Sequence, residues 1–274
     1  MKDRIAAASG KSAKAPLKVT VAGAGGKMGQ TLIEAVHADG ACTLAATFDL
    51  KGSPAVGSKI GGVKVGADAR KAIGAGEVLI DFTRPEGTIE HLELCSRLGR
   101  PIVIGTTGFS VPLKKAILRA GRRIPIAMSP NFAVGVNAVF KLTEVAARIL
   151  GDDFDVEIVE AHHRQKVDAP SGTALKLGEI AARALRRDLS RVATHGRAGD
   201  TGRRPPKQIG FHAVRGGDIV GERTVIFAGT GERVEVTVRS QSRMTYALGA
   251  LRAARFLRGR PAGVYDMNDV LGLK

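Results

Sequence analysis

One short stretch, residues 160–173, reads EAHHRQKVDAPSGT and gathers several groups that could do acid-base chemistry. His162 and His163 are adjacent, and Lys166 follows shortly after them. A histidine is suited to donate a proton near neutral pH because its unperturbed pKa is about 6.5. A lysine can do the same only when its pKa is lowered, and otherwise it stabilises developing negative charge. The stretch therefore predicts a proton donor, with His162 and Lys166 as the candidates.

The end of the same stretch predicts an anion-binding pocket. A Pro-Ser-Gly-Thr turn precedes a helical pattern at about residues 173–185, and the N–H groups at a helix start attract negative charge. Gly172 and Thr173 can present these groups and a hydroxyl to a carboxylate, and Lys166 adds a full positive charge. A single histidine more often has a structural role, but the lysine and the turn favour a functional site here.

The strand expected at residues 154–161 delivers both histidines at its end, where a chain leaving a sheet has its polar groups exposed. Neighbouring side chains on a strand point to opposite sides, so His162 and His163 are not expected to share a metal ion. No metal site is predicted. Together with a hydride donor, a proton donor and an anion pocket describe the reduction of an unsaturated carbon or imine in an acid substrate.

A second set of residues, VAGAGGKMG near the start of the chain, is typical of a dinucleotide-binding turn. A strand-like run at residues 17–22 precedes it and a helical pattern follows. Glycines permit a tight turn, approach of the backbone to pyrophosphate and close helix packing, and the helix start offers N–H groups to phosphate. A tight turn in another doubly wound protein is the plainer alternative. The candidate cofactor-binding residues are Gly23, Gly25, Gly26, Lys27, Met28 and Gly29.

Asp49 strengthens the dinucleotide interpretation because it follows the next strand, expected at residues 43–48, about 20 residues after the last glycine. A carboxylate at this place accepts hydrogen bonds from the ribose hydroxyls. The same carboxylate should repel a 2′-phosphate, and Lys51 comes only after Leu50. We therefore expect NADH to be used, with some tolerance of NADPH.

Three later turns follow strands expected at residues 78–82, 101–104 and 124–128. The carboxyl ends of parallel strands meet at one edge of the sheet, where ligands bind in doubly wound folds. The first turn follows the sequence DFT at the end of the strand at 78–82. The second turn, GTTG, offers free N–H groups and hydroxyls. The third turn, SPNF, is a candidate cofactor contact and also a candidate hinge. These turns add the candidate cofactor-binding residues Arg84, Gly105, Thr106, Thr107, Ser129, Pro130, Asn131 and Phe132.

The alternation of strands and helices in the first half of the chain predicts an α/β fold with a Rossmann-like, doubly wound parallel sheet covered on both faces. The order then changes to a helix at residues 134–150, the strand at 154–161 and, after a loop rich in Arg, Gly and Pro, three consecutive strand-like runs at 208–214, 219–228 and 233–239. Consecutive strands predict an α+β domain with a mixed or antiparallel sheet.

The predicted domains follow from this change of pattern. Residues 17–132 form the dinucleotide-binding domain, and residues 133–242 form the substrate-binding and oligomerisation domain. The helical pattern at residues 246–256 is apolar on one face, so residues 243–274 are expected to return to the first sheet. Residues 1–16 are small, basic and aperiodic and are interpreted as a loose tail. A transit peptide is the alternative, against which Asp3 counts mildly.

Composition limits the class of protein. With 44% hydrophobic, 25% charged and 4% aromatic residues, the chain resembles a globular α/β protein. The formal charge is +16, but the arginines are scattered along the chain rather than clustered in one basic region. Trp, on which the bases of a single strand could stack, is absent. No nucleic-acid partner is therefore expected. Two cysteines cannot define a disulfide framework. No run approaches the roughly 18 apolar residues that cross a bilayer, so we expect a cytoplasmic protein without a membrane partner.

Five ordered motifs carry a resemblance that covers most of the chain. VAGAGGKMG, IDFTRPEGT, VIGTTGF, EAHHRQKVDAPSGTAL and GDIVGERTV resemble the bacterial and plant dihydrodipicolinate reductases, also called 4-hydroxy-tetrahydrodipicolinate reductases. The resemblance implies NADH- or NADPH-dependent reduction of a cyclic hydroxy-dicarboxylate with loss of water, in the diaminopimelate route to lysine. It also implies a homotetramer built through the substrate domain.

The resemblance implies a role for each candidate residue. His162 is then the proton donor, Lys166 a second donor or charge stabiliser, and His163, Gly172 and Thr173 bind the substrate carboxylates. The residues of the turns that follow the first-sheet strands, with Asp49, line the cofactor. The Leu50-Lys51 pair departs from relatives that place an arginine directly after the acidic residue, which bears on cofactor preference rather than on the reaction.

Two other functions are compatible with parts of the sequence. A semialdehyde or homoserine dehydrogenase should carry a nucleophilic cysteine in a turn or a different polar set, and neither Cys42 nor Cys95 has that setting. A nucleotide sensor or nucleic-acid-binding protein that kept the fold and lost the chemistry should lack the intact set of HH, K and PSGT. The motifs therefore favour a reductase.

Overall fold

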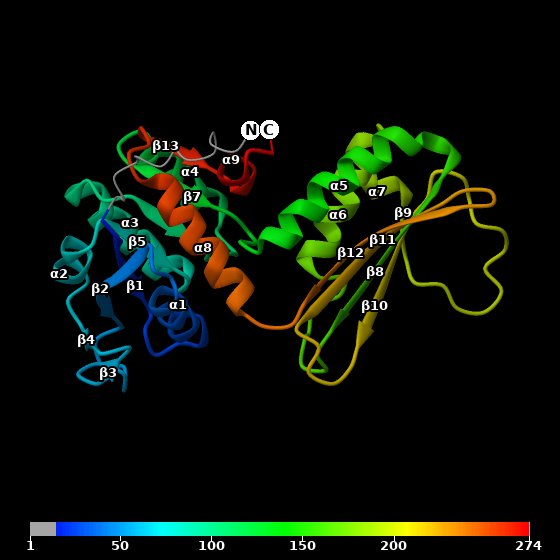
Figure 1. Cartoon of the computed structure of the whole chain (residues 1–274). Coiled ribbons are helices and arrows are strands. Elements are labelled where there is room, and N and C mark those ends of the chain that lie inside the picture. The colour runs from blue at the N-terminus through cyan, green and yellow to red at the C-terminus, as the bar shows by residue number, and fades with distance from the viewer. Residues whose placement is uncertain (1–14, 274) are drawn as a thin grey trace, which may run out of the picture.

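The computed structural model describes residues 15–273, which form two β-sheets in two lobes (Figure 1). The chain passes between the lobes twice, after the strand β7 (Pro125–Met128) and before the helix α8 (Met244–Leu257). Of the tail predicted at residues 1–16, only Ala15 and Pro16 belong to the described residues, and both are exposed.

The first sheet has eight strands in the order β13-β7-β6-β5-β1-β2-β4-β3. All neighbours pair in parallel except β3 and β4, so the prediction of a parallel sheet is right apart from a two-residue antiparallel edge. The central strands are apolar because both faces are covered; all four residues of β5 are buried. The other bounds are β1 (Leu17–Ala22), β2 (Cys42–Phe48), β3 (Lys59–Ile60), β4 (Val63–Gly66), β5 (Val78–Asp81), β6 (Ile102–Ile104) and β13 (Gly263–Tyr265).

Helices cover both faces of this sheet, as predicted, and each face has its own apolar core. The core on one face includes buried residues of α1 and α8, so the last long helix does return to the first sheet. The core on the other face includes residues of α2, α3 and α4. The bounds are α1 (Lys27–Ala38), α2 (Ala69–Ala75), α3 (Pro85–Leu98), α4 (Val111–Ala120) and, at the C-terminal end, α9 (Met267–Leu271).

The second sheet is mixed, with the order β12-β11-β8-β10-β9. The strand β8 pairs in parallel with β10 and antiparallel with β11, which confirms the expected mixed sheet. Helices α5 and α6 pack on one face and enclose a third core. The bounds are α5 (Val134–Leu150), a 3₁₀ turn (Gly151–Asp153), β8 (Asp155–His162), α6 (Gly172–Ala184), α7 (Leu189–Val192), β9 (Ala193–His195), β10 (Ile209–Arg215), β11 (Gly221–Ala228) and β12 (Arg233–Ser240).

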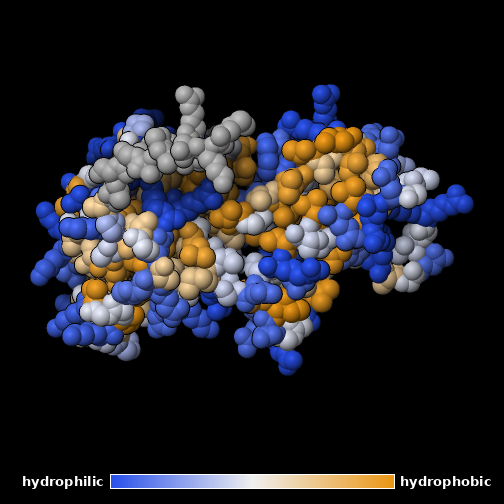
Figure 2. Space-filling model, viewed as in Figure 1, coloured by the Kyte–Doolittle hydropathy of each residue, from blue (hydrophilic) through white to orange (hydrophobic). Residues whose placement is uncertain are grey.

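The surface of the second lobe carries hydrophobic residues over α5 (Figure 2). Leu142, Val145 and Ile149 lie on that helix and are 54%, 42% and 77% exposed. Their spacing gives a stripe along one helix face, opposite the residues that enter the core. Among residues 15–273, no helix is long and apolar enough to cross a membrane.

Candidate active site

The glycine turn lies at the point where the strand order of the first sheet reverses. β1 pairs with β2 on one side and with β5 on the other. The strands up to β4 therefore extend the sheet to one side of β1 and the later strands extend it to the other, and ligands bind at such a switch point. Gly23 follows β1 with a positive φ of 70°, and a Cβ there would lie 2.9 Å from Thr83 Cγ2, beyond the end of β5. A Cβ on Gly29 would lie 2.0 Å from the Gly23 carbonyl oxygen. Both glycines are therefore required by close packing.

The turn has the form that a dinucleotide phosphate needs. Gly25, Gly26 and Lys27 are exposed at the start of α1, and Gly26 caps the helix without a side-chain hydrogen bond. The first N–H groups of a helix have no acceptor within it, so they are available to an anion. Asp49 lies beside the turn, where its Oδ2 accepts the Gly25 N–H at 2.8 Å. These residues fit the cofactor that the sequence predicts.

The other candidate cofactor residues lie after β5, β6 and β7, at the same sheet edge. Arg84 and Thr107 are exposed, Gly105 is half-buried and Thr106 is buried. In the last turn Pro130 is exposed, whereas Ser129 and Asn131 are buried and bonded to each other. Phe132 is 1% exposed and packs against Phe82 in the core, with ring centroids 5.6 Å apart. Its side chain is structural, so only its backbone is available to a ligand.

In the second lobe, His162 is 4% exposed, contrary to the expectation that the strand end exposes it. The reason is the strand period: His162 and Glu160 point to the helix-covered face of the sheet. His162 Nδ1 lies 2.5 Å from Glu160 Oε2, and its Nε2 lies 2.6 Å from Arg223 Nη2. A guanidinium offers no acceptor, so Nε2 carries the lone pair and Nδ1 donates its proton to Glu160.

Burial lowers the pKa of His162 below its ordinary value, and the charge of Arg223 lowers it further, against the opposing effect of Glu160. Burial by itself would raise the pKa of Glu160, but hydrogen bonds from Arg215 and His162 lower it overall. His162 is therefore a neutral imidazole between a carboxylate and a guanidinium in this arrangement.

The remaining residues of the stretch surround the start of α6. His163 is half-buried, and its Nδ1 is buried without a hydrogen-bond partner among the described residues. The Lys166 ammonium lies 2.7 Å from Asp168, and the lysine side chain is 21% exposed. The helix begins at Gly172, one residue before the predicted start, with Ser171 as its N-cap. Gly172 is exposed and Thr173 half-buried, so the helix start that the sequence predicts to bind an anion is accessible.

One contact joins the candidate residues of the two lobes. Asn131 Nδ2, in the turn after β7, lies 3.5 Å from Thr173 Oγ1 in the first turn of α6. The turn after β7 and the first turn of α6 thus meet at the passage between the lobes. A hydride transfer would require the cofactor and the substrate to lie close to such a meeting point.

The sequence interpretation did not identify the partners that hold these residues. Arg215 donates to both oxygens of Glu160, at 2.9 and 2.7 Å, and the Ser171 N–H donates to Glu160 at 3.1 Å. Arg223 and Asp168 are the other partners that were missed. A signal for Glu160 was present, because it lies two positions before His162 and shares its strand face. Arg215 and Arg223 come from other strands, and only the strand register reveals their contacts.

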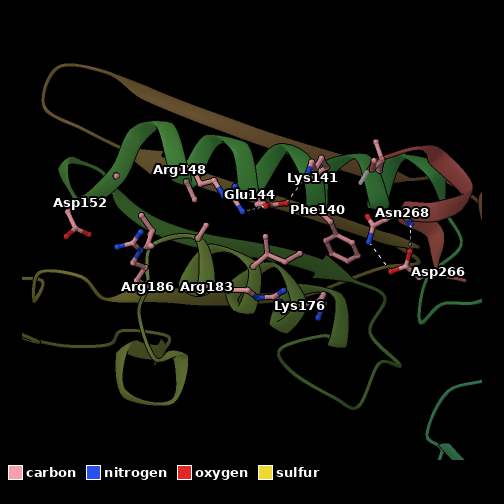
Figure 3. Close-up of a pocket in the computed structure, with 16 residues that line it drawn as sticks. Phe140, Lys141, Glu144, Arg148, Asp152, Lys176, Arg183, Arg186, Asp266 and Asn268 are labelled. Atoms are coloured by element: carbon pink, nitrogen blue, oxygen red, sulfur yellow. Dashed lines mark hydrogen bonds and ion pairs between the residues drawn. The ribbon is translucent and has the colours of Figure 1, made fainter. Parts of the chain in front are cut away.

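A groove of about 1110 Å³ runs between α5 and α6, but none of its lining residues belongs to the predicted site (Figure 3). Lys141 and Arg148 pair with Glu144 in its middle, and Asp266 and Asn268 from the C-terminal helix end it (Figure 3). The groove is therefore a separate, mostly polar surface feature.

Comparison with known proteins identifies the family. The model of the dihydrodipicolinate reductase N-terminus matches residues 17–132, and that of the C-terminus matches residues 135–271. The 4-hydroxy-tetrahydrodipicolinate reductase of Aromatoleum aromaticum is 56% identical over 94% of this chain and 96% of its own, and that of Dechloromonas aromatica is 55% identical over 94% and 98%.

Solved structures agree. A dipicolinate-bound dihydrodipicolinate reductase from Paenisporosarcina sp. TG-14 has a TM-score of 0.75 at 25% identity, covering 93% of this chain and 98% of its own. An aspartate semialdehyde dehydrogenase from Vibrio cholerae has a TM-score of only 0.52 at 11% identity, over 89% and 98%, and shares the fold alone. The chain belongs to the dihydrodipicolinate reductase family.

Proposed function

We propose that this protein reduces 4-hydroxy-tetrahydrodipicolinate to tetrahydrodipicolinate with loss of water, as a step of the diaminopimelate route to lysine. The observation that carries the proposal is the 3.5 Å contact between Asn131 and Thr173. It joins a dinucleotide-type sheet edge to a helix start suited to carboxylates. The names of the relatives, which share more than half of their residues with this chain, support the same reaction.

A nicotinamide cofactor supplies the hydride when it is bound. We propose that the cofactor is held by the glycine turn, by Asp49 and by the turns after β5, β6 and β7. The exposed N–H groups at the start of α1 bind its phosphates, and the absence of side chains on Gly25 and Gly26 leaves the backbone open to them. The residues in this role are Gly23, Gly25, Gly26, Lys27, Met28, Gly29, Asp49, Arg84, Gly105, Thr106, Thr107, Ser129, Pro130, Asn131 and Phe132.

NADH is the proposed preferred cofactor, with NADPH also accepted. The Asp49 carboxylate beside Gly25 favours ribose hydroxyls over a 2′-phosphate. The next residue, Leu50, is 71% exposed and offers no charge to a phosphate. Lys51 is the first cation after it and is also exposed.

The substrate is a dicarboxylate, and we propose that His163, Gly172 and Thr173 bind its carboxylates. The unpartnered, buried Nδ1 of His163 and the open start of α6 are groups that a carboxylate can satisfy. The Lys166 ammonium adds charge to the same place.

His162 and Lys166 are the proposed catalytic pair. The Lys166 side chain is 21% exposed and its ammonium pairs with Asp168, so Lys166 is proposed as the immediate source of the proton. His162 donates from Nε2 only after that atom leaves Arg223 and takes up a proton, because Nε2 carries the lone pair and Nδ1 is held by Glu160. The order of their roles is thus the reverse of the one that the resemblance implies, while the pair of residues is the same.

A homotetramer in the cytoplasm completes the proposal, with residues 17–132 and 243–274 as the cofactor domain and 133–242 as the substrate and assembly domain. Helices α5 and α6 cover one face of the second sheet. The other face presents half-buried residues of β11, including Thr224 and Ile226, and no described helix packs on it. That face supports assembly through the second lobe.

A coupled assay tests the reaction: the unstable substrate is generated from pyruvate and aspartate semialdehyde, and oxidation of NADH or NADPH is followed by absorbance. Lys166→Ala and His162→Ala should each lower kcat by about 10²- to 10⁴-fold, with the dissociation constant for NADH nearly unchanged. Wild-type turnover in both variants would refute the catalytic assignment. Absence of cofactor oxidation by the unmodified protein would refute the proposed reaction. A higher kcat/KM with NADPH than with NADH would refute the proposed cofactor preference.

A further inference from the structure

A buried carboxylate lies directly beneath the predicted cofactor edge and has no part in the proposed chemistry. Asp81 is the last residue of β5 and is fully buried. Its Oδ1 accepts the Thr83 N–H at 2.8 Å and the Thr83 hydroxyl at 2.6 Å. Its Oδ2 lies 2.7 Å from Nδ1 of His91, which is 8% exposed. Because a carboxylate only accepts hydrogen bonds, His91 Nδ1 carries a proton and donates it.

The network extends to the GTTG turn through one hydroxyl. Thr88, in α3, is fully buried, and its Oγ1 donates its single proton to Thr106 Oγ1 at 2.8 Å. Asp81 Oδ1 lies 3.2 Å from the same oxygen and competes for that proton. The Asp81 backbone carbonyl also accepts the Gly105 N–H at 2.8 Å. Asp81 thus anchors the turn after β6 by its main chain, and Thr88 holds the same turn through Thr106.

The same network reaches the glycine turn. Both the hydroxyl and the N–H of Thr83 are bonded to Asp81. The Thr83 methyl group lies so close to Gly23 that a Cβ on this glycine would be only 2.9 Å from it. Thr83 therefore packs against the turn after β1. Three of the turns proposed to hold the cofactor share this one buried anchor.

The direction of the bond from Thr88 decides what Thr106 can offer. Thr106 accepts a proton from Thr88, so its own hydroxyl proton is left for another acceptor. Thr106 is 4% exposed and ends the chain of hydroxyls at the sheet edge. A hydroxyl that already accepts one bond is oriented, and polarised, as a donor.

We propose that Asp81, Thr88 and His91 are positioning residues for the cofactor: they hold Thr83 against the glycine turn and present the Thr106 hydroxyl as a hydrogen-bond donor to the bound dinucleotide. This inference rests on the proposed function, since it takes the cofactor to lie at this edge. None of the three positioning residues touches the ligand itself.

A matched pair of substitutions at Thr88 tests the proposal. Thr88→Val keeps the shape and removes the hydroxyl, and Thr88→Ser keeps the hydroxyl and removes the methyl group. The dissociation constant for NADH is measured by fluorescence titration without substrate. It should rise about 10-fold in Thr88→Val, the equivalent of one hydrogen bond, and stay within about 2-fold in Thr88→Ser. A packing role alone predicts the opposite order, because serine leaves the larger void.

A second pair at His91 guards against a folding defect at Thr88. His91→Asn retains an N–H donor for Asp81, whereas His91→Leu removes it, and both lose the edge-to-face contact with Phe48. His91→Leu should weaken NADH binding several-fold more than His91→Asn, with the KM for the dicarboxylate unchanged in both. Equal NADH binding within each pair, with equal changes in Tm, overturns the positioning role. Tight NADH binding without turnover by the unmodified protein would instead refute the proposed function and leave this inference standing.

Discussion

The substitution Glu160→Gln should separate the role of the buried carboxylate in stability from its role in catalysis. The Glu160 side chain is 1% exposed and accepts hydrogen bonds from Arg215, His162 and the Ser171 N–H. Glutamine has nearly the same shape, but it removes the charge and places an NH₂ group against donors that need an acceptor. Arg215 and His162 then lose the carboxylate that they share.

The expected loss of stability follows from these contacts. Breaking a fully buried ion pair by removing one partner costs about 3–5 kcal/mol. Arg215 keeps 20% of its side chain exposed, so water offsets part of the loss, and we expect the lower end, about 3 kcal/mol. For a chain of this size that corresponds to a fall in Tm of roughly 6–12 °C. The His162 Nδ1–H also loses its carboxylate, so kcat should fall about 10- to 1000-fold.

Glu157→Gln is the matched control on the same strand. Glu157 accepts hydrogen bonds from Arg197, Arg204 and His212, but it lies on the opposite face of β8 from Glu160. It should lose stability and keep the wild-type kcat. Both variants are compared by thermal unfolding and by the coupled assay at a temperature below either Tm. A wild-type kcat in Glu160→Gln, or an equal loss of kcat in both variants, would refute the argument that Glu160 orients His162.

Two further predictions concern stability. Burial would raise the pKa of Glu157, but hydrogen bonds from Arg197, Arg204 and His212 lower it from its ordinary value of 4.5 to about 2. Because the pKa is depressed in the folded protein, Glu157 contributes up to about 3 kcal/mol of stability above pH 4.5. This contribution is lost as the pH falls toward 2. Acid unfolding of Glu157→Gln should therefore begin from a lower stability and show a shallower dependence on pH in that window, and equal slopes would contradict this. Gly29→Ala should lower the free energy of unfolding by at least about 1–3 kcal/mol, because the new Cβ would lie 2.0 Å from a backbone oxygen. The control Gly40→Ala places its Cβ in open space and should not destabilise the protein. Equal Tm values for the two variants would refute the packing argument.

The sequence was sufficient for the main elements of the fold, because these follow from local patterns. The helix predicted at residues 134–150 coincides with α5, and most other predicted elements agree within about two residues. The short strands β3, β4 and β13 were not predicted, since two to four residues carry too little periodicity. β13 is added to the sheet from the distant C-terminal end, which only tertiary pairing with β7 determines.

The candidate site was predictable as a set of residue types but not as a network. The spacing of His162, Lys166 and Thr173 indicated acid-base and anion-binding groups, and the structure brings Thr173 to Asn131. The burial of His162 was not foreseen, because it depends on which face of β8 the helices cover. The register that aligns Arg223 with Glu160 across β8 and β11 likewise has no local signal in the sequence.

Two buried carboxylates occupy comparable places in the two sheets. Asp81 ends β5, and Glu160 lies two residues before the end of β8; each accepts an N–H from the segment beyond its strand, Thr83 in one case and Ser171 in the other. Well-packed apolar residues could replace such groups with little loss of stability, so the fold alone does not account for them. Each instead fixes the segment that carries proposed ligand-binding residues. Isosteric substitution at these two positions should therefore disturb ligand binding and turnover, an effect that the exposed ion pairs elsewhere on the chain should not share.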